Sequence, residues 1–184
     1  MTLRNPARAC SMICVSTLAL AGAVSITIAG QSKTVPPVAA AALEKLLPTI
    51  EGWTSGAARS DMVEVSPDAK YSFASVTLTK GDQRVKLTLA DTGASSDSLT
   101  ALATMVVTMP DDYSGQVGDM SIKRLSIGGS PAVEAWDAHK SAGEVTTVVG
   151  GRFVASVESS KIDSIATLRG VLDKVDLKAL AAVK

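Results

Sequence analysis

Two neighbouring segments of the chain alternate between apolar and polar residues, and this alternation limits the fold more than any other feature. Within residues 71–79, Ala74, Val76 and Leu78 alternate with serine and threonine. Residues 84–89 repeat the pattern, and Gly81-Asp82 lies between the two segments. A period of two is typical of a strand with one buried and one solvated face, and a short connection with glycine is typical of a hairpin. The sequence therefore predicts an antiparallel hairpin.

The C-terminal half predicts four further strands, and a first short strand is expected at Met62–Val65. The four strands cover residues 122–127, 132–138, 144–149 and 152–158. Gly150-Gly151 connects the last two, and glycine adopts the positive φ angles of tight hairpin turns without strain. We expect the last three strands to form an antiparallel meander.

Helical patterns occur before, between and after these strands. Residues 38–47, 95–109 and 161–175 carry apolar residues at helical spacing, and a final turn or two is expected at 177–183. Ser95 or Ser96 is the expected N-cap of the middle helix. Segregated strands and helices indicate an α+β fold. The prediction is an antiparallel sheet of about six strands, a hairpin plus a four-stranded meander, covered by N-terminal, middle and C-terminal helices.

The first thirty residues are expected to direct export. Arg4 and Arg8 precede an apolar run over residues 10–30, which is the pattern of a secretory signal peptide. The run also reaches the ~20 residues that span a bilayer, so an uncleaved anchor in the inner membrane is the alternative. Residues 31–37 then form a tether, and residues 38–184 form a single α+β domain. The expected location is periplasmic or otherwise extracytoplasmic, with a membrane tether through residues 10–30 if they are retained.

Composition excludes several classes of function. Both cysteines, Cys10 and Cys14, lie in the N-terminal segment, so the exported part has no thiol for a cysteine protease, a disulfide oxidoreductase or a cysteine–zinc site. The chain has 18 basic and 18 acidic residues, and zero net charge removes the usual electrostatic argument for nucleic acid as a partner. We expect no cofactor and no nucleic-acid partner.

A metal site would have to use the single histidine. Asp137 precedes His139 by two residues, and a third ligand such as Asp111 or Asp112 would have to come from elsewhere in the fold. A surface histidine beside a hairpin turn is the better interpretation, and we expect no metal.

No motif indicates a catalytic site. Asp91-Thr92-Gly93 has the sequence of the aspartic-protease triplet, but that class needs a second aspartate in an equivalent setting, and the chain has one copy. A turn that leads into the middle helix is the better interpretation. Serine is abundant, but no Gly-x-Ser-x-Gly sequence occurs. We therefore expect that the protein is not an enzyme.

Several short segments carry a resemblance to known domains. They are Gly52-Trp53, the 71–89 hairpin, Ile127-Gly128-Gly129 running into Ala132-Val133-Glu134, and residues 148–153. They resemble a group of small exported bacterial domains whose helix-wrapped antiparallel sheet is similar to that of the PsbP family. The resemblance covers about residues 43–180, and it implies a binding or assembly module rather than an enzyme.

The expected function is therefore a non-catalytic extracytoplasmic module that binds a protein or an envelope component. The alternative is a carrier of a small apolar or amphipathic ligand between the sheet and its helices. On its strand, Trp136 shares a face with Glu134, and neither face is cleanly apolar. Packing in the core is the favoured role for Trp136, and the functional hypothesis is that it anchors a partner. The candidate binding residues are Trp136, Glu134 and Arg152.

Overall fold

The computed structural model describes residues 35–66, 69–93 and 101–184 of the chain. The chain divides into two units, Met1–Ser32 and Lys33–Lys184, and every described residue belongs to the second. The predicted export segment therefore lies outside the described residues, as do the predicted capping residues Ser95 and Ser96. No helix within the described ranges is long and apolar enough to cross a membrane.

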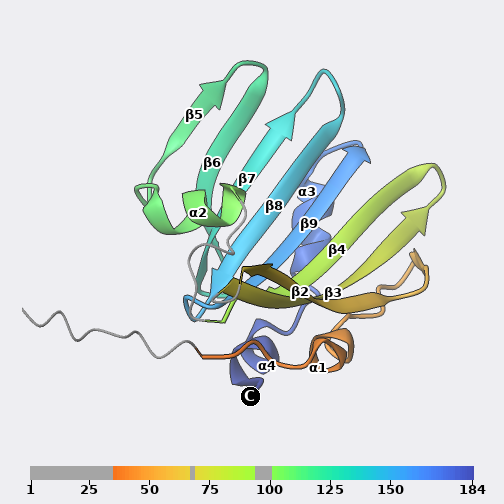
Figure 1. Cartoon of the computed structure of the whole chain (residues 1–184). Coiled ribbons are helices and arrows are strands. Elements are labelled where there is room, and N and C mark those ends of the chain that lie inside the picture. The colour runs from red at the N-terminus through yellow and green to blue at the C-terminus, as the bar shows by residue number, and fades with distance from the viewer. Residues whose placement is uncertain (1–34, 67–68, 94–100) are drawn as a thin grey trace, which may run out of the picture. The chain divides into compact units, whose positions relative to one another are not determined.

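A single antiparallel sheet of nine strands is the main element of the described part (Figure 1). The strand order is β1-β3-β4-β9-β8-β7-β6-β5, and β2 also pairs with β3. The strands are β1 (Thr54–Ser55), β2 (Arg59–Ser66), β3 (Ala69–Lys80), β4 (Gln83–Asp91), β5 (Ser114–Val117), β6 (Met120–Ile127), β7 (Ser130–Asp137), β8 (Ala142–Val149) and β9 (Phe153–Lys161).

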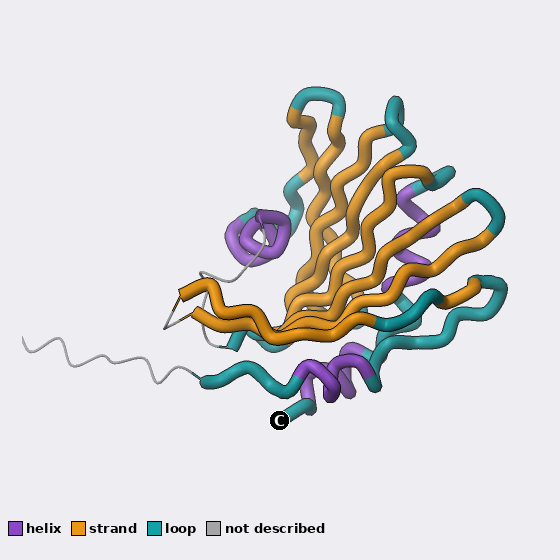
Figure 2. The backbone as a smooth tube through the Cα atoms, turned by 45° about the vertical axis from the view of Figure 1, so that its right-hand side comes forward, coloured by secondary structure: helices purple, strands orange, loops and turns teal. Residues whose placement is uncertain are grey.

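Short helices lie on both faces of this curved sheet (Figure 2). Those of the described residues are α1 (Ala40–Glu44), α2 (Ala101–Thr108), α3 (Ile165–Leu172) and α4 (Leu177–Ala182). The larger core lies between one face and the helices α1, α3 and α4, which contribute Leu43, Leu168 and Leu180. A smaller core on the other face includes Ala103 and Val106 of α2. We call these two surfaces of the sheet the α3 face and the α2 face.

The predicted local pairings are confirmed. β3 and β4 form the expected hairpin, and β6 to β9 form an antiparallel meander. In β4, Val85, Leu87 and Leu89 are buried on the α3 face, whereas the residues between them are exposed or half-buried. The alternation of the sequence therefore reports burial correctly here.

The predicted fold class is wrong in the size of the sheet and in its helical cover. The strand expected at Met62–Val65 is present within β2. The sheet has nine strands instead of about six, because β4 pairs with β9 and joins the hairpin to the meander, and because β1 and β5 extend the edges. The middle helix, predicted over 95–109, is described over Ala101–Thr108, and the helix predicted from 161 begins at Ile165 because β9 continues to Lys161. Edge strands are held by backbone hydrogen bonds, which side-chain periodicity does not report.

The turn between β8 and β9 gives a first testable prediction. Gly150 and Gly151 have φ angles of 60° and 68°, and a Cβ atom at either position would meet no other atom within 4 Å. We expect Gly150→Val to lower the free energy of unfolding by about 1 kcal/mol or more, because a β-branched residue resists positive φ. Gly150→Asn is the control, since asparagine tolerates this conformation. Equal melting temperatures for the two variants would contradict the role of φ.

Candidate functional site

The α2 face carries a groove where the helix does not cover the sheet. α2 packs near Val133, Val148 and Val154. The uncovered part holds a pocket of about 580 Å³, and a second pocket of about 360 Å³ shares Thr77 and Lys86 with it. We call the two pockets together the groove. Its principal side chains are those of Arg59, Ser75, Thr77, Lys86, Glu144 and Glu158.

The strand register places a row of charged side chains on the floor of the groove. Lys86 of β4 pairs with Glu158 of β9, and Glu158 pairs with Glu144 of β8. Thr77 of β3 extends the row beside Lys86, and Ala135 of β7 extends it beside Glu144. Directly paired residues carry their side chains on one face of the sheet, with Cβ atoms about 5 Å apart. The groove therefore combines residues from five strands.

Two ion pairs lie in the groove. Lys86 Nζ is 2.9 Å from Glu158 Oε1, and Lys140 Nζ is 2.9 Å from Asp137 Oδ2. The side chains of Lys86 and Glu158 are 52% and 50% exposed. An exposed pair of this kind contributes little to stability, about 0–1 kcal/mol, so its charged groups can exchange partners with a ligand at small cost. In the second pair Lys140 is 74% exposed but Asp137 only 6%, and Asp137 also accepts the backbone N–H groups of His139 and Lys140, so this pair is part of the turn structure.

Glu144 is the half-buried charge of the groove. Thr146 Oγ1 donates a hydrogen bond of 2.7 Å to Glu144 Oε1. Burial raises the pKa of Glu144, the bond from Thr146 lowers it, and the neighbouring charge of Glu158 raises it, with a raised pKa as the result. Among the described residues, no ion pair includes Glu144. Its carboxylate therefore keeps acceptor positions for a ligand, because an ionised carboxylate can accept about four hydrogen bonds.

The raised pKa of Glu144 leads to a second prediction, on stability against pH. Because the folded protein holds the proton more tightly than the unfolded chain, stability falls as pH rises from the ordinary value of 4.5 through the folded pKa. We therefore expect Glu144→Gln to raise the melting temperature at pH 7, and this gain should vanish below about pH 4. Glu51→Gln, at an exposed position, is the control. A lower melting temperature for Glu144→Gln at pH 7 would contradict the sign.

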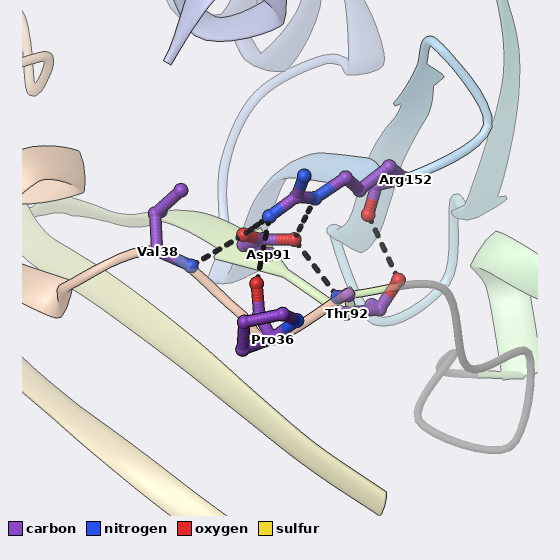
Figure 3. A network of polar contacts seen from close by, with 6 residues as sticks. Pro36, Val38, Asp91, Thr92 and Arg152 are labelled. Carbon is purple, nitrogen blue, oxygen red and sulfur yellow. Dashed lines mark hydrogen bonds and ion pairs between the residues drawn. The ribbon is translucent and has the colours of Figure 1, made fainter. Parts of the chain in front are cut away.

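A second polar cluster lies at the end of β4, away from the groove residues in the register. The Asp91 side chain is fully buried and accepts hydrogen bonds of 2.7 Å from both Nε and Nη2 of Arg152 (Figure 3). The backbone N–H groups of Val38 and Gly93 also donate to it, at 2.7 and 2.8 Å. The hydrogen bonds to Asp91 raise the pKa of Arg152. Arg152 Nη2 additionally donates to the carbonyl of Pro36 at 3.1 Å.

The hydrogen bonds of this cluster connect three segments: residues 36–38, the end of β4 and the β8–β9 turn. Gly93 has a φ of +61°, and a Cβ atom there would lie 2.5 Å from the carbonyl oxygen of Val35. The N–H of Gly93 donates to the Asp91 side chain, so the chain turns after β4, but the connection of this turn to the middle helix lies outside the described residues. Four donated hydrogen bonds occupy the Asp91 carboxylate, so it is a structural anchor rather than a group that activates water.

Two of the three candidate binding residues, Glu134 and Trp136, lie on the α3 face. Arg169 Nη2 of α3 donates a hydrogen bond of 2.8 Å to Glu134 Oε1. Trp136 is half-buried and packs against the larger core, where it pairs with Gly143 at one end of β8. Arg152 lies beyond Val149, at the other end of β8, so the structure does not bring it near Trp136. A docking role for the three residues stays a prediction.

The residues considered for a metal site do not come together: Asp137 ends β7, His139 lies in the turn that follows, and Asp111 lies before β5. His139 is exposed, and its backbone N–H donates to Asp137 Oδ1 at 3.0 Å. Hydrogen bonds from Lys140 lower the pKa of Asp137. Asp111 instead forms an ion pair of 3.3 Å with Arg124. In the part of the chain that the structure describes, no three histidine, cysteine, aspartate or glutamate side chains gather closely enough to hold a metal ion.

Comparison with known proteins identifies no relative. No protein-family model, no curated protein and no solved structure matches the chain. The groove itself was also missed from the sequence, although the polar residues that alternate along β4 are a signal for its floor. Its function must therefore be inferred from its geometry and charge.

Proposed function

We propose that the chain is a non-catalytic, extracytoplasmic module that binds a protein or envelope component in the groove on its α2 face. Export is inferred from Arg4, Arg8 and the apolar run over residues 10–30. The observation that carries the binding function is the larger pocket, of about 580 Å³. Concave surfaces with a few placed polar groups commonly hold ligands, and volumes of about 300–1,000 Å³ are usual for small-molecule sites.

The floor of the groove supports binding because it is rigid. Its strands are paired on both sides, and the α3 face directly behind it is packed with fully buried residues such as Leu87, Val145 and Val157. The backbone of such a scaffold loses little freedom when a partner binds, which favours affinity.

The side chains of the groove support binding rather than catalysis. No histidine or cysteine lines either described pocket. The hydroxyl of Ser159 donates to the carbonyl of Arg84 at 2.6 Å, so it belongs to the β4–β9 bulge. A hydroxyl nucleophile needs an adjacent general base. A charged Lys86 occupies Glu158. The hydroxyl bonded to Glu144 belongs to Thr146, which is fully buried and out of reach of a substrate.

The alternative function, a carrier of an apolar ligand between sheet and helices, has weaker support. Leu43, Leu87 and Leu168 fill this layer and are all 0% exposed. A pocket of about 220 Å³ lies beside α3 and α4, lined in part by Leu172 and Leu177. This volume is below the range of about 300–1,000 Å³ that is typical of ligand sites.

Cysteine accessibility in intact cells tests the binding function, because the chain after residue 30 has no native cysteine. Thr77→Cys places a thiol in the groove, and Ala166→Cys places one on the exposed side of α3. Cys10 and Cys14 are changed to alanine in both variants. We expect a membrane-impermeant maleimide to label Cys at 77 more slowly in the native envelope than in the purified chain, with no such difference at 166. Equal protection at both positions, or none at 77, would reject the groove as the binding surface.

A further inference from the structure

Charges of opposite sign are separated along the groove. Arg59 of β2 and Arg84 and Lys86 of β4 lie at one side. Glu158 of β9 and Glu144 of β8 lie at the other, and the strand order β2-β3-β4-β9-β8 sets this direction. The groove therefore has a cationic half and an acidic half, divided between β4 and β9. Among the residues that line the two described pockets, the one cation on the acidic side, Lys140, is matched by Asp137.

Some charged residues of the groove, both basic and acidic, form no ion pair within the described part of the protein and can interact with a ligand. Lys86 is matched by Glu158, as described above. Arg59 and Arg84 in the cationic half, and Glu144 in the acidic half, have no ion pair among the described residues. A ligand that spans both halves can therefore pair a negative group with Arg59 or Arg84 and a positive group with Glu144.

We infer that the groove binds an extended peptide segment, with a cationic side chain of the peptide against Glu144 and a carboxylate over Arg84 or Arg59. This inference rests on the proposed binding function. Neighbouring strands lie about 4.8 Å apart and a shift of two residues adds about 7 Å, so Glu144 is about 12 Å from Arg84 and about 20 Å from Arg59. An extended peptide advances about 3.3 Å per residue. The two peptide charges should therefore be four to six residues apart.

Other ligand classes fit this site less well. The charges of a single amino acid are too close together to reach both halves of the groove. Nucleotides and single-stranded nucleic acids are commonly held by stacking on aromatic side chains. Neither of the two pockets that form the groove has an aromatic lining residue. Ser75, Thr77 and Ser160 offer hydroxyl groups that can bond the N–H and C=O groups of a peptide backbone.

Calorimetry with defined peptides and the full-length chain tests this inference. The probe is an acetylated and amidated hexapeptide, Lys-Ala-Ser-Ala-Ser-Asp, and the comparison peptides replace its lysine by glutamine or its aspartate by asparagine. We expect each replacement to weaken binding about tenfold, because each removes one charge-assisted hydrogen bond to the groove. Equal affinities for the three peptides, or no binding of the first, would overturn the inference.

A charge reversal in the protein locates the cationic contact. We expect Glu144→Lys to abolish the preference for lysine and to favour the same hexapeptide with aspartate at both ends. Glu51→Lys makes the same change of net charge at an exposed position outside the groove and should leave the preference unchanged. Glu144→Gln, which keeps the size of the side chain, should lose the preference without reversing it. An unchanged preference in both Glu144 variants would overturn the inference.

The binding function of the groove and the peptide as its ligand can be rejected separately. Protection of the thiol at position 77 in cells together with no binding of the hexapeptide would reject the peptide and keep the binding function. Absence of protection at 77 would reject the binding function itself, whatever the peptides do.

Discussion

Replacing Asp91 by alanine is expected to lower the free energy of unfolding by about 3–5 kcal/mol, the largest loss among the substitutions considered. The variant leaves the Arg152 guanidinium, whose side chain is 25% exposed, without its carboxylate partner. It also leaves the N–H groups of Val38 and Gly93 without an acceptor. Removal of one member of a buried ion pair is costly, because the remaining charge and donors are desolvated without compensation. Urea unfolding of the full-length chain at pH 7 measures the loss.

An exposed ion pair provides the control for Asp91. Glu64 pairs with Lys70 at 2.9 Å, and the two side chains are 57% and 43% exposed. Glu64→Ala should change the free energy of unfolding by less than about 0.5 kcal/mol. If Asp91→Ala cost no more than Glu64→Ala, the cluster in Figure 3 would not fasten the three segments.

The second large effect is expected at Gly143, in the central strand β8. A Cβ atom at this position would lie 2.6 Å from the carbonyl oxygen of Ala135 and 2.8 Å from the ring of Trp136. The indole therefore lies across the glycine, and neither the backbone nor the packed ring can move freely. We expect Gly143→Val to cost about 3 kcal/mol, as is typical of overpacking in a core.

Gly170 on α3 is the matched control for this substitution, because a Cβ atom there would meet nothing within 4 Å. Gly170→Ala should be neutral or stabilising by up to about 1 kcal/mol, since glycine is unfavourable inside a helix. A small loss for Gly143→Val would mean that Trp136 is not held against β8. That result would support the aromatic anchor predicted from the sequence.

Local sequence patterns predicted the parts of the fold that depend on neighbouring residues. The β3–β4 hairpin and the turn at Gly150-Gly151 are of this kind, because alternation and positive φ act over a few residues. The pairing of β4 with β9 is different, since it joins Leu87 to Val157 across a long stretch of chain. No local pattern specifies such a partner, so the hairpin and the meander could not be joined into one sheet from the sequence.

The edge strand β5 shows why the size of the sheet was underestimated. Its sequence, Ser114-Gly115-Gln116-Val117, has no alternation and contains a glycine, which are features of a loop. It is a strand because its backbone pairs with β6, from Ser114 opposite Lys123 to Val117 opposite Met120. Its side chains are exposed or half-buried, so hydrophobic periodicity could not report it.

The candidate site could not be predicted from the sequence, because its residues come together only through the pairing of distant strands. Lys86, Glu144 and Glu158 come from three strands, and only the register places them in one row. Each looks like an ordinary solvated charge in its own segment. Trp136 was a candidate because neither face of its strand is cleanly apolar, yet this pattern does not distinguish a docking residue from one that packs against a core.

Site-specific photo-cross-linking in the native envelope tests the binding surface most directly. A benzoylphenylalanine at position 77 lies in the groove, and one at position 166 lies on the exposed side of α3. We expect a discrete adduct from 77 that is suppressed by an excess of the Lys-Ala-Ser-Ala-Ser-Asp peptide, and no adduct from 166. An adduct from 166 with none from 77 would contradict the assignment of the α2 face as the binding surface.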